Sequence, residues 1–347
     1  DQQTNTQAGM KLTIDRSALL RALNHVQSVV ERRNTIPILS NVLIRAEQGS
    51  MRLSTTDMDL EIDEAVAASV QAEGATTVPA HTLHDIVRKL PDGAEVELAM
   101  DESGTAITVK AGRSNFRLSC LPVSDFPEIS GGELPNAFTM EAGDLRALID
   151  KTRFAMSTEE TRYYLNGIYL HAGENNSEQV LRAVATDGHR LARFEMPQPE
   201  GAADIPGVIM PRKAVGELRK LIEDAADTIE VSLSESKIRF TFDHIILTTK
   251  LIDGTFPDYE RVIPKINDKI VAVDPKQFSG AIDRVSTISE TKSRAVKIAL
   301  QGNQMSLSAN SPESGSASED LEISADIEPL EIGFNAKYLL DITSQIE

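Results

Sequence analysis

Apolar and polar residues alternate along most of this chain, and six stretches interrupt the alternation with apolar residues at helical spacing. Segments such as 50–55, 95–100 and 237–242 place an apolar side chain at every second position, which is typical of strands with one buried face. Each helical stretch follows directly after a short strand. The helical stretches begin near residues 15, 80, 142, 211, 275 and 336. The pattern predicts an α+β protein in which helices cover sheets.

The strand-to-helix unit recurs in three repeats with a period of roughly 130 residues. The first strand and helix of each repeat cover residues 12–23, 138–149 and 270–282. A second strand and helix follow halfway along each repeat, at 78–87, 209–218 and 332–340. We therefore predict three similar domains, each of two βαβββ halves with two sheets backed by two helices. Their expected bounds are 10–133, 134–266 and 267–347.

The two ends of the chain depart from the repeats. Residues 1–9 form a polar stretch before Met10, and we interpret them as the remnant of an expression tag. The third repeat ends just after its second helix. By comparison with the other two repeats, its closing two or three strands are expected to be missing.

The net charge of −18 would argue against binding nucleic acid if it were spread evenly, because phosphates repel an acidic protein. The charge is uneven, however: the six helices together carry about +5, and the rest of the chain about −23. One interpretation is that helices in general favour Lys and Arg; the other is that these helices form a basic surface inside an acidic shell. The sequence leaves both interpretations open.

Few other features restrict the class of protein. No apolar run approaches the ~18 residues that span a bilayer, so no membrane association is expected. Cys120 is the single cysteine and has no internal disulfide partner, which favours a reducing cytoplasm. The six histidines show no zinc spacing, and no phosphate-binding loop is present. We therefore expect no metal and no cofactor.

Residues 185–191 are the only segment that invites an enzymatic interpretation. Asp187, His189 and Arg190 lie close together there, as in a hydrolase or a metal enzyme. The favoured interpretation is a strand-turn-strand in which Asp187-Gly188 makes the turn. The enzyme centred on Asp187 and His189 stays as an alternative, and a triplicated β-rich adhesion module is a second one.

Several long motifs in fixed order resemble those of the bacterial β sliding clamps, the processivity factors of the replicative DNA polymerase. The resemblance runs from Met10 to Glu347. Its motifs are Thr35-Ile36-Pro37-Ile38-Leu39, Thr77-Val78-Pro79-Ala80, Arg162-Tyr163-Tyr164-Leu165-Asn166-Gly167, Thr186-Asp187-Gly188-His189-Arg190-Leu191, Met210-Pro211-Arg212-Lys213, Phe256-Pro257-Asp258-Tyr259-Glu260-Arg261-Val262 and Ile332-Gly333-Phe334-Asn335. The usual Met-Pro-Met-Arg-Leu-like ending of the family is missing.

The resemblance implies a cytoplasmic, non-enzymatic homodimer in which two head-to-tail chains close a ring of six similar domains. Helices line the hole and sheets form the outer surface. Such a ring encircles duplex DNA without reading its sequence. It tethers the replicative polymerase and repair proteins through a short linear motif, and an ATP-driven clamp loader opens it. No cofactor is implied.

The resemblance also assigns residues to three surfaces. The residues implied to touch DNA are Arg33 on the first helix, Tyr163, Tyr164, Arg212 and Lys213; Glu159 stands where the family often carries a glutamine. The residues implied to form a partner-peptide pocket between the second and third domains are Leu165, Thr186, Gly188, His189, Arg190, Leu191, Pro257, Arg261, Val262, Asn335 and Tyr338. The residues implied at the dimer interface are Phe116, Leu118, Thr287 and Ile288. Phe116 and Leu118 share one strand face, so burial in the core is a rival interpretation of both.

Overall fold

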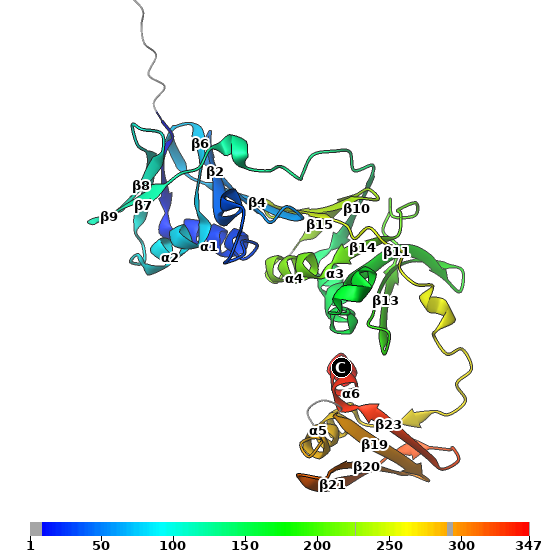
Figure 1. Cartoon of the computed structure of the whole chain (residues 1–347). Helices are drawn as coiled ribbons and strands as arrows, with labels where there is room; N and C mark the ends of the chain where they lie inside the picture. The colour runs from blue at the N-terminus through cyan, green and yellow to red at the C-terminus, as the bar shows by residue number, and fades with distance from the viewer. Residues whose placement is uncertain (1–8, 226, 290–293, 347) are drawn as a thin grey trace, which may run out of the picture. The chain divides into compact units, whose positions relative to one another are not determined.

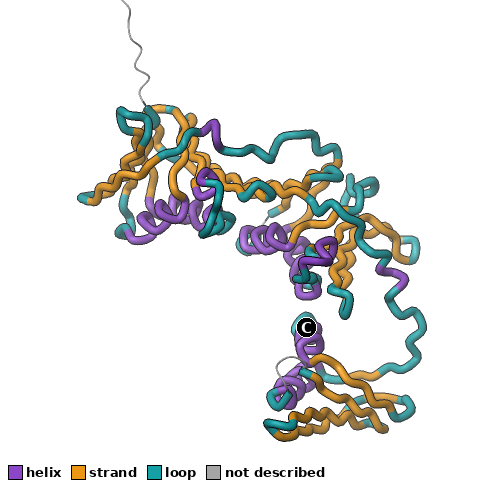
Figure 2. The backbone as a smooth tube through the Cα atoms, in the orientation of Figure 1, coloured by secondary structure: helices purple, strands orange, loops and turns teal. Residues whose placement is uncertain are grey.

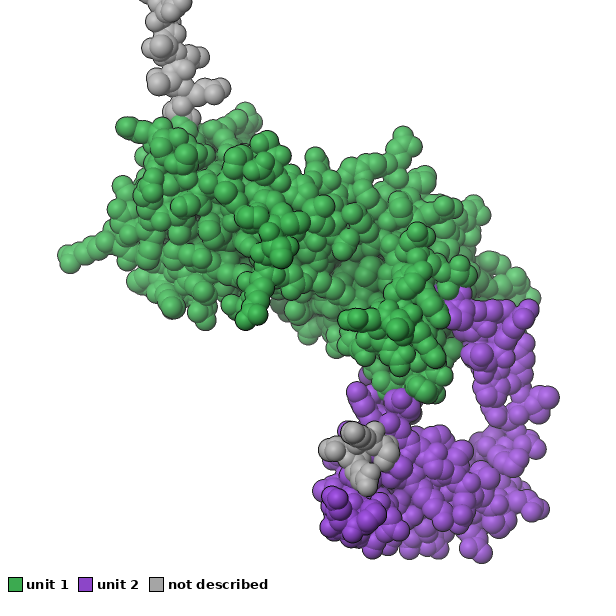
Figure 3. All heavy atoms as spheres, viewed as in Figure 1, with its two compact units in different colours: residues 1–255 green, residues 256–347 purple. Residues whose placement is uncertain are grey.

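The computed structural model describes residues 9–225, 227–289 and 294–346. The chain divides into two compact units, residues 1–255 and 256–347 (Figure 3). The first unit contains the first repeat and the second repeat up to residue 255; the second unit contains the segment 256–266 and the third repeat. The tag interpretation concerns residues 1–9, which lie outside the described residues except for Gly9. The predicted bounds of the three domains stay predictions.

The first repeat contains the two predicted βαβββ halves. Its first half consists of β1 (Lys11–Asp15), α1 (Arg16–Gln27), β2 (Asn41–Glu47), β3 (Ser50–Thr56) and β4 (Leu60–Ala67). Its second half consists of β6 (Gly74–Pro79), α2 (Ala80–Lys89), β7 (Glu95–Met100), β8 (Ala106–Ala111) and β9 (Ser114–Ser119). A short strand that the sequence did not predict, β5 (Ser69–Ala72), lies between the halves and pairs with β1.

The second repeat has the same order of elements. Its first half consists of β10 (Asn136–Glu141), α3 (Ala142–Asp150), β11 (Gly167–Asn175), β12 (Glu178–Thr186) and β13 (Leu191–Pro197). Its second half consists of β14 (Val208–Pro211), α4 (Arg212–Leu221), β15 (Thr228–Leu233), β16 (Lys237–Phe242) and β17 (Ile245–Lys250). The predicted architecture is therefore confirmed in both repeats of the first unit.

The first strand of each half pairs with strands of the other half. In the first repeat β1 joins β7, which gives the sheet β5-β1-β7-β8-β9, and β6 joins β2. In the second repeat β10 likewise joins β15, and β14 joins β11. Because each sheet needs strands from both halves, neither half can fold as a separate domain.

One sheet crosses from the first repeat into the second. Strands β4 and β17 pair antiparallel, with Ile62 opposite Leu247, and complete the eight-stranded sheet β10-β15-β16-β17-β4-β3-β2-β6 (Figure 1). The pairing removes two exposed sheet edges. A single cluster of buried apolar side chains runs through both repeats. The two repeats are therefore joined by backbone hydrogen bonds as well as by a common core.

The four helices of the first unit lie on one side of its sheets (Figures 1 and 2). Helix α1 buries Leu19, Leu23 and Val26, and α4 buries Val215, Leu218 and Leu221. These residues recur at spacings of three and four, so each helix has one apolar face for the sheet and one polar face away from it. The polar faces of the helices form a common surface of the unit.

The second unit has a sheet and a core of its own. Its elements are β18 (Val271–Ala272), α5 (Pro275–Ser286), β19 (Ala295–Gln301), β20 (Gln304–Ser311), β21 (Gly315–Glu322), β22 (Ser324–Ala325), β23 (Leu330–Asn335) and α6 (Ala336–Thr343). The sheet order is β21-β20-β19-β23. Phe334, the second-to-last residue of β23, is 38% exposed, whereas Val78 and Met210, at the same position of the matching strands β6 and β14, are 0% and 2% exposed. Among the described residues, no strand follows α6 that could cover Phe334.

Candidate functional site

The cations expected to touch DNA lie on the helix side of the first unit. Arg212 is the first residue of α4 and is exposed. Arg33 is also exposed, but the prediction that it lies on the first helix is wrong: α1 ends at Gln27, and Arg33 lies in the turn that follows. After α1 the chain turns at Ser28 and Val29, and Val29 and Val30 are both buried.

Tyr163 and Tyr164 lie in the 3₁₀ segment η4 (Glu160–Leu165). Tyr163 is 53% exposed and Tyr164 is half-buried. Their rings meet edge to face, with centroids 5.7 Å apart. The Tyr163 ring therefore packs on one side against Tyr164 and is exposed to solvent on the other.

Lys213 differs from Arg33 and Arg212 because its charge has partners in the chain. Its Nζ donates to Val29 O at 3.0 Å, to Glu31 Oε1 at 2.7 Å and to Asp57 Oδ2 at 2.7 Å. Partial burial would lower the pKa of the ammonium group, but the hydrogen bonds to Asp57 and Glu31 outweigh it and raise the pKa. Lys213 is therefore charged at neutral pH, and any phosphate must compete with two carboxylates.

The segment around Asp187 forms the predicted turn between β12 and β13. Asp187 Oδ1 accepts from the backbone N–H groups of His189 and Arg190, at 2.9 and 3.0 Å. Its Oδ2 accepts from Arg190 Nε at 3.1 Å. Gly188 has φ +90°, a conformation that glycine adopts without strain. Because both carboxylate oxygens hold the turn, Asp187 is poorly suited to act as a catalytic base.

The pocket residues of the first unit are grouped around this turn. Arg190 lies over the Phe154 ring, 5.6 Å from its centroid. Gly188 and His189 are exposed, while Thr186 and Leu191 are half-buried. Leu165 ends η4 and is only 3% exposed. Five of the six first-unit residues of the predicted pocket therefore lie on this one turn or at its two ends.

The remaining pocket residues belong to the second unit. Pro257 and Val262 are exposed, Val262 to 70%, and Arg261 pairs with Asp258 at 2.9 Å. The amide oxygen of Asn335 accepts from Lys337 N at 2.9 Å and so caps α6. Tyr338 is half-buried.

The predicted dimer residues lie on or near open sheet edges. Strand β9 pairs with β8 alone and carries Phe116 and Leu118. Leu118 is 9% exposed and belongs to the core of the first unit, so within the single chain the rival interpretation, burial in the core, holds for this residue. Phe116 packs against the same core. In the second unit Thr287 and Ile288 follow α5. Strand β21 also has an open edge but was not among the predicted interface elements; the repeated strand order was the available signal.

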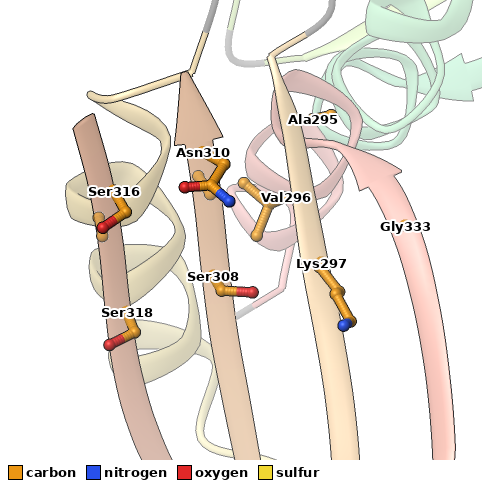
Figure 4. A pocket seen from close by; sticks show the side chains of 10 residues that line it. Ala295, Val296, Lys297, Ser308, Asn310, Ser316, Ser318 and Gly333 are labelled. Carbon is orange, nitrogen blue, oxygen red and sulfur yellow. The ribbon is translucent and has the colours of Figure 1, made fainter. Parts of the chain in front are cut away.

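A shallow hollow of about 520 Å³ lies on the sheet of the second unit, and Figure 4 shows its lining. Ser308 and Ser318 are paired across the strands there, and Lys297 lies beside Ser308. Lys297 also pairs with Glu331 at 3.2 Å. The hollow contains small polar side chains and a single cation, so it lacks the convergent groups of a catalytic site.

The described residues contain no cluster of His, Cys, Asp and Glu side chains that could hold a metal ion. Within the same residues, no helix is both long enough and apolar enough to cross a membrane.

The chain matches three sequence profiles in order. They are the N-terminal, central and C-terminal domains of the DNA polymerase III beta subunit, over residues 10–130, 139–258 and 260–347. The beta sliding clamp of Caulobacter vibrioides is 54% identical over 337 residues, which cover 97% of this chain and 91% of that protein. That of Pseudomonas aeruginosa is 40% identical over 338 residues, which cover 97% and 90%.

Solved structures give the same result. The Caulobacter crescentus beta sliding clamp crystallised with polyethylene glycol has a TM-score of 0.96 and 54% identity, covering 98% of this chain and 91% of that one. A sliding clamp from Bartonella birtlesii bound to griselimycin has a TM-score of 0.94 and 52% identity, covering 97% and 90%.

Proposed function

The chain belongs to the DNA polymerase III beta subunit family, the bacterial β sliding clamps, and from this premise we infer how its surfaces serve that function. It is a DNA sliding clamp and not an enzyme, so the hydrolase centred on Asp187 and His189 is not supported. It encircles duplex DNA as a dimer and holds replication and repair proteins on it. We place it in the bacterial cytoplasm, where a loader that uses ATP opens the ring.

The joint between the first two repeats is the observation that supports ring closure. It pairs β4, the last strand of a first half, with β17, the last strand of a second half. The same positions elsewhere in the repeats are β9, β13 and β21, and all three have an open edge. We propose that β9 of one chain pairs with β21 of a second chain. Phe116 would pack beside this joint, and Thr287 and Ile288 would flank it.

The helix surface of the first unit suits DNA that slides. Arg33 and Arg212 are exposed cations on it, and Tyr163 adds an exposed ring, with Tyr164 packed behind it. Cations that contact phosphates bind every sequence alike, which a sliding protein requires. We therefore assign the direct phosphate contacts to Arg33 and Arg212. The acidic remainder of the chain repels DNA from the outer surface.

We propose that partner peptides bind at the turn that follows β12. Leu165 and Leu191 would supply its apolar floor, and Thr186, Gly188, His189 and Arg190 its polar edge. Such an apolar surface with a few polar groups suits a short extended peptide with a glutamine and bulky apolar anchors.

Leu191→Lys is expected to reduce the affinity for a peptide with a glutamine followed by spaced Leu and Phe by about 100-fold, ~2.8 kcal/mol. A lysine would place a charge where the peptide buries an apolar anchor. Arg190→Ala should cost about tenfold. Isothermal titration would measure both. Arg193→Ala is the matched control, since Arg193 lies on the same strand outside the predicted pocket. Equal binding by all variants would show that the peptide does not bind at this site.

Electron microscopy of the purified protein tests the assembly directly. The expected image is a ring with a central hole formed by two chains. Images that show only extended single chains at micromolar concentration would contradict ring closure by the β9 and β21 edges.

A further inference from the structure

We propose that Lys213 joins the first repeat to the second and positions the turn that carries Arg33, rather than contacting DNA itself. We call Lys213, Glu31 and Asp57 the clasp. Lys213 is the second residue of α4, in the second repeat, whereas Glu31 and Asp57 belong to the first. Both carboxylates lie 2.7 Å from Nζ. The clasp therefore links the two repeats on the helix side of the β4 and β17 pairing.

The position of Lys213 makes it an unfavourable place for a charge without partners. A helix N-terminus carries a partial positive charge, so a cation in the first turn is repelled. Arg212 stands in the same turn and is exposed, where water screens it. Lys213 is only 34% exposed, and its three hydrogen bonds offset the repulsion. The observed geometry is thus a specific arrangement and not a free surface cation.

The turn that supplies Asp57 is a second copy of the turn at Asp187. Asp57 Oδ1 accepts from the backbone N–H groups of Asp59 and Leu60, at 2.9 and 2.8 Å. Thr56 Oγ1 accepts from Met58 N at 3.1 Å. The same three bonds hold the second turn, from the hydroxyl of Thr186 to the backbone of Arg190. Met58 even shares the positive φ of Gly188, at +84°.

The two copies differ in what they do with the remaining carboxylate oxygen. In the second repeat, Asp187 Oδ2 binds Arg190 of its own turn. In the first repeat, Asp57 Oδ2 binds Lys213 from the neighbouring repeat. In both copies of the turn, the carboxylate Oδ2 takes no part in the backbone hydrogen bonds. Only in the first copy does this oxygen bind a residue of the neighbouring repeat.

Other contacts between the repeats hold the same region. The N–H of Lys250 on β17 donates to Asp59 O at 2.8 Å. Ser28 Oγ donates to Glu217 Oε2 on α4 at 2.5 Å, and Glu217 is buried. Lys213 also binds Val29 O. Residues 28–31 are thus attached to α4 at three points, and Arg33 lies two residues beyond the last of them.

Hydrogen exchange of the whole protein without DNA tests the clasp. Lys213→Met keeps the length of the side chain and removes the ammonium group. We expect amides in residues 28–34 and 56–60 to exchange about tenfold faster, as loss of charge-assisted hydrogen bonds predicts. Arg212→Met removes the same charge from the adjacent position and should leave those amides unchanged. Unchanged exchange in Lys213→Met, or an equal change in both variants, would overturn the clasp.

Asp57→Asn tests the positioning of Arg33, which rests on the proposed DNA function. The substitution keeps the oxygen that holds the turn and removes one negative charge. If Lys213 touched DNA directly, the variant would bind short duplex DNA more tightly, since a competing carboxylate is gone. The clasp predicts the opposite sign: weaker binding, by a factor similar to that for Lys213→Met.

Binding of Asp57→Asn as tight as, or tighter than, that of the unsubstituted protein would overturn the positioning role. Glu31→Gln gives a second, milder variant at an exposed carboxylate and should shift binding in the same direction. If the unsubstituted protein shows no DNA binding at low salt, the DNA proposal fails, and the exchange experiment still decides whether the clasp exists.

Discussion

Arg117→Pro is expected to convert the dimer into monomers, whereas Arg117→Ala should leave it intact. Cys120 N–H donates to Thr105 O, just beyond the Ser119–Ala106 pair where β9 ends and β8 begins. Because partners alternate along an antiparallel pair, the backbone of Arg117 then faces the open edge of β9. Proline has no N–H to donate to a second chain, and edge strands tolerate it. Sedimentation velocity over a range of concentrations would measure the change.

Arg117→Ala is the matched control because it also removes the ion pair with Asp101 but keeps the N–H group. Leu118→Asp would be a poor test of the interface, since Leu118 lies in the core and a buried charge would destabilise the first unit itself. Circular dichroism should show that Arg117→Pro remains folded. A folded Arg117→Pro variant that stays dimeric at nanomolar concentration would show that β9 is not the joint.

Cutting a circular DNA is expected to release a loaded clamp that stays on the uncut circle through repeated washes. A ring holds DNA by topology, so its retention does not need strong contacts, and a free end lets it slide off. The measurement is the fraction of protein that stays with the DNA in gel filtration, before and after a single restriction cut. Equal retention on cut and uncut circles would contradict encirclement.

The contribution of direct phosphate contacts can be measured separately from retention by topology. Arg33→Ala with Arg212→Ala should lower the salt slope of binding to short duplex DNA by about 2 per chain, as expected for two lost phosphate contacts. Retention on an uncut circle should change little. Lys89→Ala, at the end of α2, is the control for loss of a helix cation outside the predicted contacts.

The elements and their order could be predicted because they depend on local pattern. Alternation at period two and spacing at period 3.6 gave two βαβββ halves in each full repeat, and the repetition itself gave the similar domains. The turn at Asp187 was predictable for the same reason, since Asp-Gly and the flanking strands are contiguous. The resemblance to the sliding clamps then named surface residues that no periodicity could reveal.

The end of α1 was not predictable from pattern alone. Arg33 follows a run of helix-compatible residues, but the helix stops at Gln27, and Val29 and Val30 beyond it pack in the core that both repeats share. The short strand β5 was missed for a related reason: four residues carry too little pattern, and β5 exists by pairing with β1.

By itself the sequence determined which segments are strands and helices, how they repeat, and which family they resemble. Only the tertiary structure decided which edges pair, as β4 and β17 do, that Leu118 lies in the core, and that Lys213 binds Glu31 and Asp57. The pattern of apolar and polar residues depends on interactions between residues a few positions apart. Lys213 and Asp57 are 156 positions apart, and the environment of such a charge is set by whichever distant groups the fold brings beside it.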